Sequence, residues 1–159
     1  MPGYNNILVN RWGLPEDAST VTVYLSLTGD GRVQGRLFNP YIELPLAFEG
    51  LGDMFLYMEL VYDYLDYPYS PNPPAKFVRR QDSEPRKTEK RPSFRRYREP
   101  GTGGPPSYRS SFEIKVRTRN AESWQGSVVW KEKNLRRSFT SALQLLHLIS
   151  DALGLPRLQ

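Results

Sequence analysis

The stretch FEIKVRTRNAESWQGSVVWKEKNLRRSFTSALQLLHLISDALGLP, residues 112–156, decides the fold because it has the pattern of three strands followed by a helix. Apolar and charged side chains alternate over 112–117, which is typical of a strand with one buried face. A second strand is expected over 124–130, with a tryptophan at each end of one face. A third, shorter strand is expected over 135–139.

The last part of this stretch has the pattern of a helix with one apolar side. Thr140 or Ser141 can cap its start, and Gly154 followed by Pro156 ends it. Apolar residues recur at helical spacing along one face: Ala142, Leu145, Leu146, Ile149, Ala152 and Leu153. The stretch therefore predicts a β-β-β-α unit.

An earlier stretch, residues 21–65, aligns with 112–156 without a gap. Few residues are identical, so the alignment depends on the shared apolar periodicity. Strands are expected over 21–26, 33–38 and 42–48, and a helix follows whose apolar face is Leu51, Met54, Phe55, Met58, Val61 and Tyr62. Gly35 and Gly126 occupy the same inward position of the second strands, which predicts a close approach of a helix or an aromatic ring.

A unit of about 45 residues buries too little apolar surface to fold alone, so two units are expected to share a core. We predict an α+β fold with one largely antiparallel six-stranded sheet, two helices on one face and an approximate two-fold axis. The first unit and an N-terminal extension would span 1–70, a flexible basic linker rich in Pro, Gly and Arg 71–110, and the second unit 111–159. Two separate small domains held by the linker are the alternative.

The second unit contains Trp124-Gln125-Gly126, an aromatic strand to Trp130, a Phe-x-Ser helix start at 139–141 and a leucine-rich helix. In these features it resembles a family of short uncharacterised bacterial proteins, over the C-terminal ~45 residues. The first unit departs from the pattern, because Val33 and Asn39 stand where the two tryptophans would be. The resemblance implies this fold and a bacterial origin, and it implies no activity and no functional residue.

The composition excludes several kinds of site. The chain has no cysteine, which excludes disulfides and cysteine-ligated zinc, and its single histidine excludes the usual multi-histidine metal sites. The first ten residues lack the features of a signal peptide, and no run of about 20 apolar residues could span a bilayer. We therefore expect a cytoplasmic protein with no cofactor, no metal and no membrane partner.

Two groups of polar residues contain elements of catalytic sites. His147 and Asp151 lie four residues apart on the second helix and could form half of a nucleophilic triad. Carboxylates that could do acid–base work surround the first helix: Glu49, Asp53, Glu59, Asp63 and Asp66. Helical spacing favours a solvated polar face in both places, so we expect no catalytic residues and no enzyme activity.

Basic residues gather in the linker and on one strand. The net charge is +5, and most of the excess lies between Lys76 and Ser110. Candidates for contact with nucleic acid or an acidic partner in the linker are Arg79, Arg80, Phe94, Arg95, Arg96, Tyr97 and Arg98. On the open face of the sheet, Lys115, Arg117 and Arg119 are expected to add a basic surface. A solvated linker and an ordinary charged sheet face are the alternatives.

The outer side of the first helix is apolar as well, since Leu56, Tyr57, Leu60 and Tyr64 lie away from the face that should meet the sheet. Such a cluster indicates a protein partner or a homodimer contact, unless the linker or residues 1–16 cover it. The sequence favours a non-enzymatic protein-interaction or adaptor module of a bacterial assembly, docking through this helix surface and the basic linker. The first alternative is a protein that binds RNA or single-stranded DNA through the linker and the basic sheet face. A weaker alternative is an enzyme with an unrecognised site between the two units.

Overall fold

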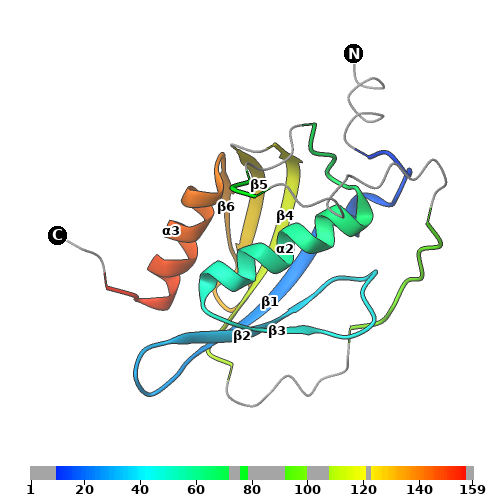
Figure 1. The fold of residues 1–159 in the computed structure, drawn as a ribbon. Helices are drawn as coiled ribbons and strands as arrows, with labels where there is room; N and C mark the ends of the chain where they lie inside the picture. The colour runs from blue at the N-terminus through cyan, green and yellow to red at the C-terminus, as the bar shows by residue number, and fades with distance from the viewer. Residues whose placement is uncertain (1–9, 72–75, 79–91, 100–107, 121–122, 157–159) are drawn as a thin grey trace.

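The computed structural model describes residues 10–71, 76–78, 92–99, 108–120 and 123–156. The elements in chain order are η1 (Glu16–Ser19), β1 (Thr20–Leu27), β2 (Val33–Phe38), β3 (Leu46–Glu49), α2 (Leu51–Leu65), β4 (Ser110–Arg119), β5 (Trp124–Trp130), β6 (Leu135–Phe139) and α3 (Ala142–Leu153). The strands form one antiparallel sheet in the order β3-β2-β1-β4-β5-β6, and both α-helices lie on one side of it (Figure 1). The predicted α+β class is confirmed.

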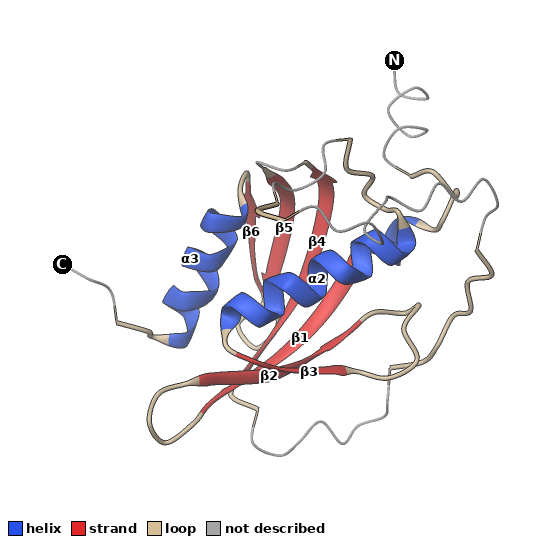
Figure 2. Ribbon diagram, viewed as in Figure 1, coloured by secondary structure: helices blue, strands red, loops and turns tan. Residues whose placement is uncertain are grey.

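Strands β1 and β4 join the two halves of the sheet, and each half consists of three strands and one helix (Figure 2). Thr22 pairs with Glu113, and these two residues are equivalent in the alignment of 21–65 with 112–156. An approximate two-fold axis would pass through this pair. The register is consistent with the predicted repeat, which itself stays a prediction.

The apolar face of each strand and helix forms the core, as the periodicity predicts. From the strands the buried residues include Val21, Val23, Leu25, Leu37, Phe112, Ile114 and Val116. From the helices they are Met54, Met58, Val61, Tyr62 and Leu65 of α2 and Leu145, Ile149 and Leu153 of α3. Burial of these side chains is the main source of the stability of the sheet–helix contact.

Gly35 and Gly126 each lie where a neighbouring strand leaves no room for a side chain. A Cβ on Gly126 would lie 1.9 Å from the backbone oxygen of Lys115, and one on Gly35 would lie 2.2 Å from that of Tyr24. The ring of Phe48 would be 2.8 Å from the Cβ added at Gly35. The predicted approach of an aromatic ring is therefore found at Gly35, whereas the atoms nearest to Gly126 are the backbone of the adjacent strand β4 and not a ring or a helix.

Helix α3 begins and ends where the sequence predicts. The Ser141 side chain caps it by accepting a hydrogen bond of 3.0 Å from the Gln144 N–H. Gly154 ends it in the left-handed conformation, with φ of 70°. Helix α2 lacks a side-chain cap at its start, where Gly50 has φ of 84°, and it ends at Asp66, which is also left-handed.

The third strand is shorter than predicted, because it begins at Leu46 and not near residue 42. The buried Asn39 explains the difference. Its side-chain amide donates to the carbonyl oxygens of Ala18 (2.8 Å) and Thr20 (3.0 Å), and its side-chain oxygen accepts from the Tyr41 N–H (2.9 Å). These bonds hold residues 39–41 as a turn, so the chain reaches the edge of β2 only later.

Candidate functional site

A groove separates the first half of α2 from the start of α3. Its volume is about 460 Å³, and the residues that shape it include Phe55, Leu56 and Glu59 of α2, Trp124 of β5, and Leu143 and Leu146 of α3. Concave, mostly apolar surfaces with a few polar groups are the usual form of binding sites in proteins. This groove is therefore the candidate site.

Trp124 contributes an aromatic surface to the groove. Its ring lies 5.7 Å from that of Phe55 and 5.8 Å, edge-on, from that of Tyr62, between ring centroids. Trp124 is buried, and Tyr62 is fully buried on α2. These contacts fix the indole ring, so Trp124 forms a rigid apolar part of the groove lining.

Two leucines on the two helices remain exposed at the groove. Leu56 of α2 is 61% exposed and Leu143 of α3 is 60% exposed, although both belong to the groove lining. A scattered leucine on a surface needs no explanation, but two at one apolar groove indicate a contact surface. The sequence prediction included Leu56 and missed Leu143.

A carboxylate, Glu59, lines the same groove. Burial raises the pKa of Glu59 above its usual value, and the neighbouring Asp63 carboxylate raises it further, while Arg119 acts in the opposite direction. The Arg119 guanidinium lies 4.0 Å from Glu59 and 2.7 Å from Asp63. The groove thus combines an apolar lining with one acidic side chain, Glu59, whose negative charge is partly balanced by Arg119.

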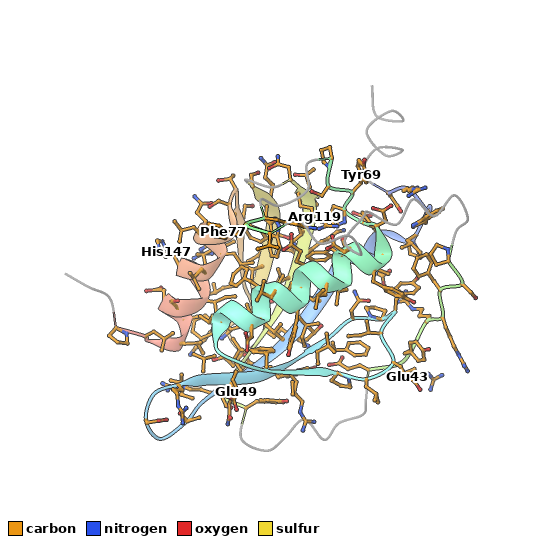
Figure 3. The ribbon with its side chains drawn as sticks, viewed as in Figure 1. Glu43, Glu49, Tyr69, Phe77, Arg119 and His147 are labelled. Atoms are coloured by element: carbon orange, nitrogen blue, oxygen red, sulfur yellow. The ribbon has the colours of Figure 1, made fainter. Side chains whose placement is uncertain are left out.

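Arg119 does not lie on the open face of the sheet, and this part of the sequence prediction is wrong. The register of β4 against β5 shifts between Val116 and Thr118, so Arg117 is an extra residue and the alternation reverses after it. Arg119 therefore points to the helix side, where its side chain is 3% exposed (Figure 3). Its Nε donates to the Pro68 carbonyl oxygen at 2.6 Å.

The predicted helix surface is partly exposed and partly covered. Leu56, Leu60 and Tyr64 are exposed, whereas Tyr57 is half-buried and packs against the core. Phe94, from the predicted linker, packs edge-on against Tyr64 with 5.6 Å between ring centroids. The linker thus contacts the end of α2, and of the predicted interaction residues only Leu56 lines the groove.

The basic candidates do not form one continuous surface in the part of the chain that the structure describes. Arg96 pairs with Asp17 at 2.6 Å, and Lys115 pairs with Glu16 at 2.8 Å, so acids of η1 compensate both. The hydrogen bond from Arg96 lowers the pKa of Asp17. Arg95, Arg98 and Arg117 are exposed, Tyr97 is half-buried, and Arg79 and Arg80 lie outside the described residues.

The open face of the sheet carries a pair of stacked tyrosines that the sequence did not predict. The rings of Tyr24 and Tyr108 are 5.0 Å apart with an angle of 23° between their planes. The Lys131 ammonium lies 6.0 Å from the Tyr24 ring, and the Tyr24 hydroxyl bonds to Glu99. The pair joins β1 to the residues just before β4.

His147 and Asp151 are exposed on α3, as the helical spacing predicts, and Figure 3 shows His147 on the outer side of that helix. Among the described residues, no group of three or more His, Cys, Asp or Glu side chains could hold a metal ion. No described helix is both long and apolar enough to cross a membrane. Neither finding adds a second candidate site.

Comparisons with models of known families, with curated proteins and with solved structures find no match for this chain. The resemblance to short bacterial proteins therefore stays a prediction. Any assignment of function depends on the chemistry of the described surfaces, among which the groove between α2 and α3 combines an apolar lining with two exposed leucines.

Proposed function

We propose that the protein is a non-enzymatic interaction module that binds an apolar segment of a partner protein in the groove between α2 and α3. The observation that carries the proposal is the pair of exposed leucines, Leu56 and Leu143, beside the buried ring of Trp124. Apolar side chains of a partner would replace water on the two leucines and would pack against the small part of Trp124 that is exposed. Burial of that area is the usual driving force of such contacts.

The chemistry of the groove defines the partner further. Glu59 lies among the apolar lining residues, so a partner segment with a lysine or arginine next to its apolar side chains fits best. An amphipathic helix with anchors one turn apart is the common ligand of grooves between helices. The exposed Arg95 and Arg98 of the linker would supply a second contact, with acidic residues of the same partner.

Replacing either groove leucine by aspartate, as Leu56→Asp or Leu143→Asp, is expected to weaken partner binding at least about tenfold, because an exposed anchor is lost and a charge enters the groove. The fold should be unaffected, since both side chains are mostly in water. Leu44→Asp is the matched control, because Leu44 is 72% exposed and does not line the groove.

The cysteine-free chain allows a direct measurement. A photo-crosslinker attached through Leu143→Cys should capture a polypeptide from the native host that Leu44→Cys does not capture. The same chain carrying Leu56→Asp should lose that product. Identical products from both attachment positions would contradict the proposal.

Nucleic-acid binding is the second candidate function, and the stacked Tyr24 and Tyr108 beside Lys131 favour it. Aromatic rings next to cations can stack with bases and neutralise phosphates. If this candidate is right, RNA or single-stranded DNA should shift the protein in a gel at low salt, and Lys131→Ala should weaken the shift. Affinity should also fall steeply as salt rises. No shift at low salt would exclude it.

A further inference from the structure

We propose that the chain carries its own ligand for the groove, the segment Lys76-Phe77-Val78, which docks between α2 and α3 and competes with the partner. The competition depends on the function proposed above, but the docking does not. The segment belongs to the predicted linker, close behind α2 in the chain. This part of the linker would then act as a regulatory element as well as a connection.

The last two residues of the segment are apolar and exposed in the structure. Phe77 is fully exposed and Val78 is 63% exposed. Exposing two adjacent large apolar side chains to water costs free energy, and docking them on an apolar surface removes that cost. The groove offers such a surface in Trp124, Phe55 and Leu143.

The chain path places the segment within reach of the groove. The carbonyl of Pro68 is held by Arg119, and Asn120, the next residue after Arg119, lines the groove. Eight residues lie between Pro68 and Phe77, and the nine residue steps from one to the other span about 30 Å when the chain is extended. In the view of Figure 3, Phe77 is drawn between Arg119 and His147.

The charges of the segment and of the groove are also complementary. Lys76 directly precedes Phe77, and Glu59 is the acidic residue of the groove. A segment with a cation next to an aromatic ring matches a groove with a carboxylate near an indole ring. Because the segment is tethered, its effective concentration at the groove is about millimolar, so even a weak affinity keeps the groove partly occupied. A partner must then displace it.

Disulfide trapping tests the docking, since the chain has no cysteine of its own. In the full-length variant Val78→Cys/Leu143→Cys, mild oxidation should form an intramolecular disulfide quickly. Adding Phe77→Ser should slow that reaction about tenfold, because the docking side chain is lost while the tether is unchanged. The pair Val78→Cys/Leu44→Cys, with Leu44 outside the groove lining, should react slowly and should not respond to Phe77→Ser.

Equal disulfide rates with and without Phe77→Ser would overturn the docking, and so would equal rates at positions 143 and 44. Partner capture separates this result from a failure of the proposed function. If both proposals hold, Phe77→Ser alone should increase capture by the photo-crosslinker at position 143. If the segment docks and no partner exists, the disulfide result stands, while capture stays absent in every variant.

Discussion

Gly126→Ala is expected to lower the free energy of unfolding by about 3 kcal/mol or more, which is a large part of the 5–15 kcal/mol typical of a domain. The added Cβ would lie 1.9 Å from the Lys115 backbone oxygen and 2.9 Å from the Val116 Cα. Both atoms belong to the backbone of β4, so no side-chain rotation can make room. The strands β4 and β5 must separate locally, and their hydrogen bonds are lost with that movement.

Urea denaturation followed by circular dichroism measures this effect. Gly52→Ala in α2 is the control, because nothing lies within 4 Å of a Cβ added there. Alanine is the better helix former, so this change should be neutral or stabilising by up to about 1 kcal/mol. Equal stabilities of the two variants would show that β4 and β5 are not packed as closely as the structure has them.

The strands and helices could be predicted from the sequence because local pattern determines them here. Alternation over 112–116 matches the buried face of β4, and Ser141 and Gly154 mark both ends of α3. The strand bounds of β2, β5 and β6 also agree with the prediction. Each of these features depends on neighbours within a few residues, which is what periodicity and capping report.

Features that depend on distant contacts could not be predicted in the same way. The position of Arg119 depends on one extra residue, Arg117, in the pairing of β4 with β5. Gly126 was the available signal, since it pairs with Val116 next to the register shift and a strand glycine often marks a bulge. Likewise, the late start of β3 depends on the hydrogen bonds that the Asn39 side chain donates to Thr20 of β1 and to Ala18, which lies just before β1.

The candidate site was half predicted for the same reason. The apolar outer side of α2 can be recognised from helical spacing, so Leu56 was identified. Leu143 and Trp124 come from elements far away in the chain, and only the packing of both helices on one side of the sheet brings them to Leu56. The signal for Leu143 in the sequence was its position, because it is a large apolar residue that lies outside the apolar face of α3.

The second large effect concerns the buried arginine. Arg119→Met should lower the free energy of unfolding by about 2–4 kcal/mol, somewhat less than for a fully buried ion pair, because the acids it pairs with keep contact with water. The change removes a 2.7 Å contact to Asp63 and a 2.6 Å hydrogen bond to the carbonyl of Pro68, which is buried. Hydrogen exchange should also speed up around residue 68, since the segment after α2 loses its attachment to β4.

The stability that is lost in Arg119→Met should increase as pH rises. Burial already raises the pKa of Glu59, and Arg119 opposes that rise, so its removal raises the pKa further. A carboxyl with a higher pKa in the folded state than in the unfolded state costs stability once it ionises, and that cost disappears as pH falls below the unfolded value. The free energy of unfolding of the variant should therefore be closest to that of the wild type near pH 4 and furthest below it near pH 7.

Lys115→Met is the matched control, because Lys115 lies on the same strand and pairs with Glu16 on the other side of the sheet. Glu16 is largely exposed, so the loss of this pair should change the stability little. If Arg119→Met lowers the free energy of unfolding no more than Lys115→Met does, Arg119 must be as solvated as Lys115. The bulge at Arg117 would then be absent in solution, and with it the hydrogen bond that ties Pro68 to β4.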